Sequence, residues 1–420
     1  MGGDIIGLRF YPRGMRKHLR VVALLIPMVL FASNSYAAVK AGSACTKVGA
    51  KSISAGKSYT CIKSGKKLVW DKGVLVPVAK PAVVKPTPAP SASASATPKP
   101  SSTPKPAPTV ANITFENLLE NNANVSYTAW KKAADSINLS YAKNVAPEVY
   151  TGPNTKAFYN DLQLPISLVS RLFPNYDEPK KILWIRYNFI DIAWAENQAK
   201  EKLSAADYAQ ISIYQGGTLA GSNCDLAASN CRGSYQQTGP SGISLIMEGV
   251  ANTLPSDLVS KSDLSPGMVE AHEYFHSLQR IPIMNRGIQV WPPAWWREGS
   301  ADWVQNVAIN FKDFESYKSF LKSDCEGNCS KLSEAELAEF LSTAKDNFVP
   351  AKFDQFLNYS LGSHVVEILV AIKGPDVLID MYAEMGKGKT FNDAFYGFFG
   401  ISWNDAIPIL AKSIYKDLHS

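Results

Sequence analysis

Histidine is scarce in this chain, with five residues in 420. His18 lies near the N-terminus and His419 lies next to the C-terminus, so the rest of the chain holds only three. Two of these three, His272 and His276, stand four positions apart in the segment His-Glu-Tyr-Phe-His. On an α-helix this spacing places both imidazoles on one face, one turn apart. A chance arrangement of so few histidines would rarely produce this spacing, which therefore indicates a metal site.

Cysteine is also sparse, and none of the six residues has the Cys-x-x-Cys spacing that is typical of zinc clusters. A second metal cluster is therefore a weak alternative, especially as no histidine lies near a cysteine in the sequence. Disulfides, which form in oxidising compartments, are the favoured interpretation. The expected partners are three local pairs: Cys45 with Cys61, Cys224 with Cys231, and Cys325 with Cys329.

The apolar run at residues 21–31 is too short to span a bilayer comfortably. It follows a basic stretch and precedes Ser35-Tyr36-Ala37, which fits a small-x-small cleavage site. We therefore expect residues 1–37 to be a signal peptide, with an uncleaved anchor as the alternative. A signal peptide predicts a secreted or cell-envelope associated protein.

Acidic residues are almost absent from the next part of the chain. Residues 38–111 hold 12 lysines and only Asp71, a net charge of +11. Residues 1–37 contribute +4, so the net +6 of the whole chain leaves −9 for residues 112–420. A basic arm on an acidic body suggests contact with an anionic cell-envelope surface, although lysines could simply keep the arm soluble. An acidic body on an exported chain argues against nucleic acid as a partner.

Composition divides the basic arm into two parts. Residues 38–75 form a small two-cysteine module, which resembles a short module of secreted actinobacterial proteins. Residues 76–111 are rich in Pro, Ala, Ser and Lys, cannot bury a core and are expected to be a disordered linker.

Residues 112–420 are long enough for a large folded domain. We expect an α+β fold, with a mixed α/β upper lobe at 112–264 and a mainly helical lower lobe at 265–420. Strands are predicted at residues 181–187, 210–214 and 241–247, the last as an edge strand beside the His272 helix. Helices are predicted at residues 115–139, 193–203, 294–310, 333–344, 359–372, 375–385 and 402–418, and Ser265-Pro266 is the expected start of the His272 helix.

A catalytic zinc site needs three protein ligands and one open position. No histidine follows His276 closely, so the spacing favours Glu298, on a helix that Pro292-Pro293 would begin. Glu273 could flank the metal and act as the general base toward a zinc-activated water. Asp302, one turn beyond Glu298, could accept the free ring N–H of a ligand histidine.

These residues resemble the gluzincin zinc metallopeptidases, the thermolysin-like and aminopeptidase-like group. The segment Glu298-Gly-Ser-Ala-Asp302 is similar to the glutamate-ligand segment of that family. The segment Tyr359-Ser-Leu-Gly362 is similar to a downstream segment whose tyrosine stabilises the oxyanion. His364 is a weaker candidate for that role. Glu248, in a partial match to the family's amine-binding segment, is a candidate substrate-binding residue.

The resemblance implies a zincin-like catalytic domain that binds one Zn²⁺ per chain through His272, His276 and Glu298. It also implies hydrolysis of peptide bonds in a peptide or protein substrate, with Glu273 as base and Tyr359 as oxyanion donor. Two alternatives stay open: an inactive metallopeptidase-like protein that binds the cell surface, or a zinc enzyme that acts on another amide.

Overall fold

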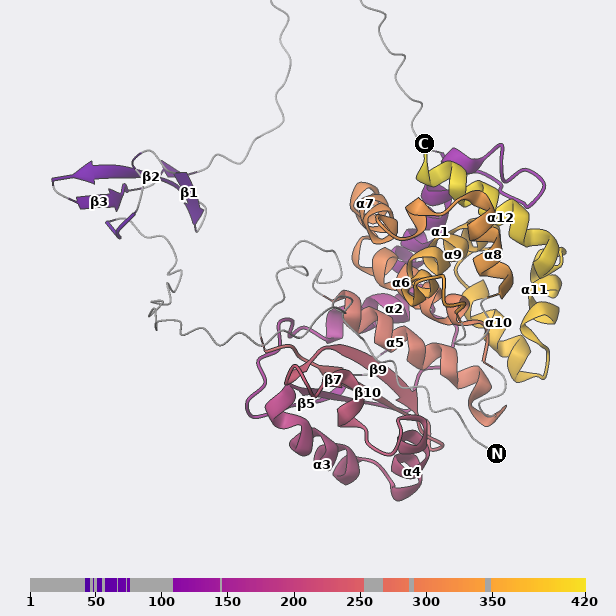
Figure 1. The fold of residues 1–420 in the computed structure, drawn as a ribbon, viewed down its shortest axis with the longest axis horizontal. Coiled ribbons are helices and arrows are strands. Elements are labelled where there is room, and N and C mark those ends of the chain that lie inside the picture. The colour runs from indigo at the N-terminus through magenta and orange to yellow at the C-terminus, as the bar shows by residue number, and fades with distance from the viewer. Residues whose placement is uncertain are drawn as a thin grey trace, which may run out of the picture. The chain divides into compact units, whose positions relative to one another are not determined.

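Figure 1 shows the computed structural model of the chain. The structure describes residues 42–75, except 46–47, 49–50, 55–56, 66 and 73, and residues 109–420, except 144–145, 253–266, 287–290 and 344–348. The described residues belong to two compact units. The predicted signal peptide at 1–37 and nearly all of the predicted linker at 76–111 lie outside the described residues.

The smaller unit contains an antiparallel β-sheet. Its strands are β1 (Lys51–Ser54), β2 (Lys57–Ser64), β3 (Lys67–Trp70) and β4 (Val74–Leu75), and β2 pairs with each of the others. The predicted disulfide between Cys45 and Cys61 joins the chain before β1 to β2. Because so small a sheet buries little apolar surface, the covalent link contributes much of its stability.

The larger unit has a four-stranded sheet in the order β5-β6-β10-β9. Its strands are β5 (Glu148–Thr151), β6 (Lys181–Tyr187), β9 (Gly233–Thr238) and β10 (Ile243–Gly249). Three strands are parallel, and β9 pairs with β10 in the antiparallel direction. The predicted strand at 241–247 therefore exists as β10, but its prediction as an edge strand is wrong, because β10 has partners on both sides and β9 lies at the edge.

Both faces of this sheet are buried, which explains the almost continuous apolar sequence of β6. On one face, Leu183 and Leu245 pack with helix α3 (Ile192–Lys202) and helix α4 (Ala205–Tyr214). On the other face, Trp184 and Ile246 belong to the main core of the helical part. The sheet thus separates two cores and supports the helices on its second face.

The predicted strand at 210–214 is wrong, because these residues end helix α4. Ser204 caps the start of this helix by accepting a hydrogen bond from the backbone N–H of Asp207. Ile211, which belongs to this helix, has a buried side chain. The cap and the packing of this apolar side chain outweigh the strand preference of Ile-Ser-Ile-Tyr.

Ten further α-helices complete the described part of the larger unit. They are α1 (Val125–Leu139), α2 (Gln163–Leu172), α5 (Met268–Arg280), α6 (Ala294–Ile309), α7 (Phe314–Cys325), α8 (Glu334–Thr343), α9 (Ser360–Lys373), α10 (Val377–Gly386), α11 (Phe391–Phe399) and α12 (Trp403–Leu418). Short 3₁₀ turns are η1 (Asn122–Asn124), η2 (Phe189–Asp191), η3 (Ala220–Asn223), η5 (Ile281–Arg286), η7 (Cys329–Lys331) and η8 (Gln355–Asn358), and a small ribbon joins β7 (Cys224–Asp225) to β8 (Asn230–Cys231).

The mixed architecture confirms the α+β prediction, with helices concentrated after residue 267. The predicted helix at 115–139 is too long, because α1 begins only at Val125. Ser265 and Pro266 lie outside the described residues, and α5 begins after Gly267, whose φ of +91° suits glycine. No helix in the described part of the chain is both long and apolar enough to cross a membrane.

Candidate metal centre

Helix α5 lies between the sheet and the helical part, where it contacts both β9 and α6 (Figure 1). Almost all of its side chains are buried, because each face of the helix meets another element. His272 and His276 project from one face, and their rings pack edge to face with centroids 4.7 Å apart. The helix therefore produces the side-by-side imidazoles that the sequence spacing predicts.

Helix α6 brings the carboxylate of Glu298 to these two rings. Glu298 Oε2 lies 3.6 Å from His272 Nε2 and 3.3 Å from His276 Nε2. The ligand atoms of the three residues all lie within 4.8 Å of one another. Two imidazole nitrogens and one carboxylate oxygen are a donor set that suits Zn²⁺, so the residues present fit the metal that the sequence predicts.

Charge complementarity keeps Glu298 ionised. Burial alone would raise the pKa of this carboxyl, but Arg297 and His276 hold it well below its usual range. Arg297 Nε donates a hydrogen bond of 2.8 Å to Glu298 Oε1, which leaves Oε2 toward the histidines. Burial lowers the pKa of His276, and the Glu298 carboxylate outweighs that effect and raises it. The site therefore holds an anionic ligand at neutral pH.

A glutamine orients the second histidine. His276 Nδ1 lies 2.7 Å from Gln279 Oε1, and Gln279 Nε2 donates to Ser300 Oγ and to the carbonyl of Arg297. With Nδ1 engaged, Nε2 is the ring nitrogen that remains for a metal. Asp302 was expected to orient a histidine in this way. Asp302 Oδ1 accepts a hydrogen bond of 2.5 Å from Gln305 Nε2, and the role of Asp302 toward a ligand histidine stays a prediction.

Glu273 is held by the edge strand of the sheet. Ser234, on β9, donates a hydrogen bond of 2.6 Å from its hydroxyl to Glu273 Oε1. The other oxygen, Oε2, is buried and has no hydrogen-bond partner among the described residues. This arrangement fixes the carboxylate and leaves one oxygen free to accept a proton.

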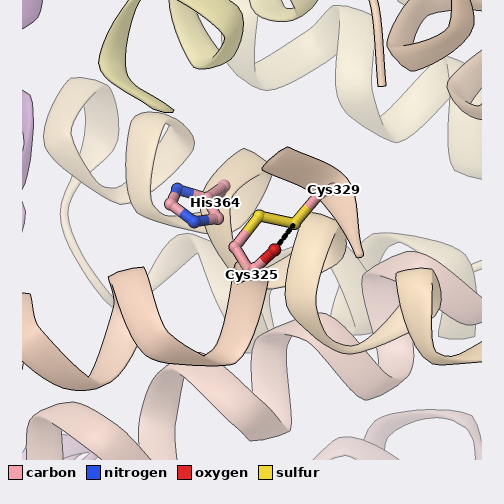
Figure 2. A group of neighbouring side chains, drawn as sticks. All are labelled: Cys325, Cys329 and His364. Atoms are coloured by element: carbon pink, nitrogen blue, oxygen red, sulfur yellow. Dashed lines mark hydrogen bonds between the residues drawn. A yellow bond between two sulfur atoms is a disulfide. The ribbon is translucent and has the colours of Figure 1, made fainter. Parts of the chain in front are cut away.

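Tyr359 lies directly before α9 and stacks on His272, with ring centroids 5.9 Å apart and an interplanar angle of 20°. Burial, and then the Glu298 carboxylate, raises the pKa of Tyr359 well above its usual value. The hydroxyl therefore stays protonated at neutral pH and can donate a hydrogen bond. His364 lies elsewhere, beside Cys325 and Cys329 (Figure 2), so these two candidates for the oxyanion role belong to different clusters.

Glu248, the candidate substrate-binding residue, already has partners inside the protein. Its Oε1 forms a 2.8 Å ion pair with Arg186, and its Oε2 accepts a hydrogen bond of 2.8 Å from Trp184 Nε1. Arg186 also lies 3.6 Å from Glu270. Burial and the charge of Glu248 raise the pKa of Glu270 to about 7. With both carboxylate oxygens engaged, the amine-binding role of Glu248 gains no support and stays a prediction.

Four residues near the centre were not found from the sequence: Ser234, Gln279, Arg297 and Tyr382. Tyr382 is fully buried on α10, and its electrostatic interactions with Arg297 and Glu298 place it close to the ligand glutamate. Arg297 directly precedes Glu298, and Gln279 lies three positions after His276. Their closeness in the sequence to the predicted ligands was a signal that could have identified both residues. Ser234 and Tyr382 carried no sequence signal, because only the packing of β9 and α10 brings them to the site.

The structure joins the remaining cysteines in the predicted pairs, Cys224 with Cys231 and Cys325 with Cys329. No family model, curated protein or solved structure matches this chain. The functional argument therefore depends on the chemistry of the site itself.

Proposed function

We propose that this chain is an exported, zinc-dependent peptidase with a zincin-like catalytic domain of the gluzincin type. The observation that supports the proposal is the convergence of His272, His276 and Glu298, with their ligand atoms within 4.8 Å of one another. Glu273 lies next to the first ligand on the same helix, and its carboxylate is fixed by Ser234. This is the set of groups that hydrolysis of an amide by an activated water requires.

His272, His276 and Glu298 would hold one Zn²⁺. When bound, zinc supplies Lewis acidity, which acidifies a water molecule and polarises the carbonyl of the substrate. Burial of the ligands strengthens the attraction between the cation and the Glu298 carboxylate, because water screens it less. Arg297 keeps that carboxylate charged and limits its rotation through the hydrogen bond to Oε1.

Glu273 would act first as a base and then as an acid. Its Oε2, which no described residue engages, would accept the proton of the attacking water, and the same oxygen would later give that proton to the leaving amine. Ser234 holds Oε1 throughout, so the carboxylate keeps one orientation for both transfers. The protonated hydroxyl of Tyr359 would donate to the oxygen of the substrate carbonyl as negative charge develops there.

The metal site is tested by the zinc content of the full chain, purified without added zinc or reductant and measured by elemental mass spectrometry. We expect about one zinc per chain. A variant with both His272→Ala and His276→Ala should lose it, whereas His419→Ala, an exposed histidine, should retain it. A chain that holds no metal and takes up none on titration contradicts the proposal.

The catalytic role of Glu273 needs a separate test. Glu273→Gln should keep the zinc and lower hydrolysis of a quenched fluorescent peptide library by at least about 10²-fold. Glu201→Gln, on the exposed surface of α3, is the matched control and should leave the rate unchanged. Zinc binding without hydrolysis in the wild-type chain would instead support an inactive, surface-binding protein.

A further inference from the structure

A second group of metal-ligating side chains lies outside the proposed catalytic centre. Cys325 ends α7, Cys329 begins η7, and His364 lies on α9 (Figure 2). One ligand atom from each of the three residues lies within 4.8 Å of the other two. All three side chains are at least 97% buried, so solvent does not compete for this position.

The imidazole of His364 is unusually placed for a residue with only a packing role. Its Nε2 is buried without a hydrogen-bond partner among the described residues, although leaving such a buried atom unpaired is energetically unfavourable. The ring also interacts with the backbone of Leu321, one helical turn before Cys325. Burial lowers the pKa of His364, so the ring is neutral near pH 7 and keeps a lone pair that can bind a metal.

The two cysteine sulfur atoms can exist either as a disulfide or as thiols. In the structure they form a disulfide, and Cys329 Sγ lies 3.7 Å from the backbone carbonyl oxygen of Cys325 (Figure 2). In a reduced chain the Cys329 thiol can donate weakly to that carbonyl. Two thiolates and one imidazole form a soft donor set, which favours Zn²⁺ or Cu⁺ over hard cations such as Mg²⁺.

We propose that Cys325, Cys329 and His364 form a redox-controlled metal site, which is closed by the disulfide and binds one Zn²⁺ when the cysteines are reduced. Two external thiols together supply two electrons and two protons, which reduce the S–S bond to two cysteine thiols, and are themselves oxidised to one disulfide. Zn²⁺ then displaces the two thiol protons and binds both sulfurs and His364 Nε2. The site is separate from the proposed catalytic centre and does not depend on the proposed function.

The proposal is tested by comparing metal binding to the oxidised and reduced full chain. The protein is reduced with a phosphine, freed of reductant without oxygen, and titrated with Zn²⁺ and with Co²⁺. We expect reduction to add one bound metal per chain and to produce a thiolate-to-cobalt charge-transfer absorption band. The centre at His272 does not contain cysteine, so it contributes equally to both samples and cancels in the difference.

Variants assign the additional metal to these residues. Cys325→Ser with Cys329→Ser should abolish the increase, whereas Cys224→Ser with Cys231→Ser should leave it, since no histidine belongs to that pair among the described groups. His364→Gln keeps the disulfide, so it does not depend on the serine variant folding. It should weaken the additional metal at least about tenfold. Three results would overturn the proposal: an equal metal content before and after reduction, an increase that persists in the Cys325/Cys329 variant, or an additional metal that His364→Gln binds with wild-type affinity.

Discussion

At the scale of single residues, the candidate centre depends on which charges are neutralised and which are left available. Arg297 neutralises Glu298 without occupying the oxygen that faces the histidines. Gln279 fixes His276 without adding charge, and Ser234 does the same for Glu273. The polar neighbours therefore orient the three functional groups and leave one atom of each without engaging it.

Tyr359 provides the clearest test at this scale. Tyr359→Phe removes one hydroxyl and keeps the ring that stacks on His272. If the hydroxyl stabilises the oxyanion, kcat should fall about 10²–10³-fold, with little change in KM and no loss of zinc. Steady-state kinetics on a cleaved peptide, together with metal analysis, measures all three quantities.

Tyr396→Phe, at an exposed position of α11, serves as the control and should behave like the wild-type chain. A Tyr359→Phe variant with wild-type kcat would exclude the tyrosine as the oxyanion donor. Tyr382, which is buried beside Arg297 and Glu298, would then be the next residue to change.

At the scale of elements, the close crossing of α6 and α9 brings Glu298 and Tyr359 into one site. Gly299 and Gly362 face each other at this crossing, and a Cβ built on Gly299 would lie 2.3 Å from the backbone carbon of Gly362. Glycine at both positions lets the two backbones touch. Glu298 directly precedes one of these glycines, and Tyr359 lies within one turn of the other.

Gly299→Ala should therefore force the two helices apart. We expect it to lower the unfolding free energy by about 1–3 kcal/mol or more, because the added methyl meets backbone rather than a flexible side chain. The displaced ligand should also weaken zinc binding. Denaturant unfolding and metal titration measure the two effects.

Gly397→Ala is the matched control for this prediction. A Cβ on Gly397, inside α11, meets no atom within 4 Å. The substitution should leave stability unchanged or raise it by up to about 1 kcal/mol, because alanine favours helix over glycine. If both alanine variants were equally stable, the close crossing would not be a requirement of the fold.

At the scale of the whole molecule, helices α1, α7, α9 and α12 enclose a buried polar group around Glu367. Burial, followed by the nearby Asp417 carboxylate, raises the pKa of Glu367 from 4.5 to about 8. Tyr317 donates a hydrogen bond of 2.7 Å to Glu367 Oε1. The folded state therefore retains a proton here that the unfolded chain releases near pH 4.5.

This difference predicts a pH-dependent stability. The contribution of neutral Glu367 is fully present below about pH 4.5 and is lost as pH rises toward 8, because the unfolded chain ionises first. Glu367→Gln stays neutral and retains an acceptor for Tyr317. Relative to the wild-type chain, it should gain stability between pH 4.5 and 8, by on the order of 1 kcal/mol or more.

Urea unfolding at a series of pH values measures this gain, with Glu201→Gln as the exposed control. Charges elsewhere in the molecule, including those of the candidate metal centre, are common to both chains and cancel in the difference. Parallel stability curves for Glu367→Gln and the wild type would contradict the prediction.

The sequence by itself determined those features that depend on local spacing. The pairing of His272 with His276 follows from the repeat of one helix, and the cysteine pairs follow from short loops. The buried strand β6 and the helices α6, α8, α9, α10 and α12 follow from apolar patterns and helix-start signals, whereas α7 and α11 were not predicted. The arrival of Glu298 at the two histidines was also predicted, although only by assuming that two helices meet.

Only the tertiary structure decided which distant residues meet. The edge position of β9, and with it the contact between Ser234 and Glu273, depends on strand order, which short-range patterns do not encode. The meeting of Tyr359 with His272 depends on the glycine crossing of α6 and α9. His364 stands far from every cysteine in the sequence, which made a second metal cluster a weak alternative, yet packing of α9 against α7 brings it to Cys325 and Cys329. These contacts join segments far apart in the chain, and their geometry is set by how the cores pack.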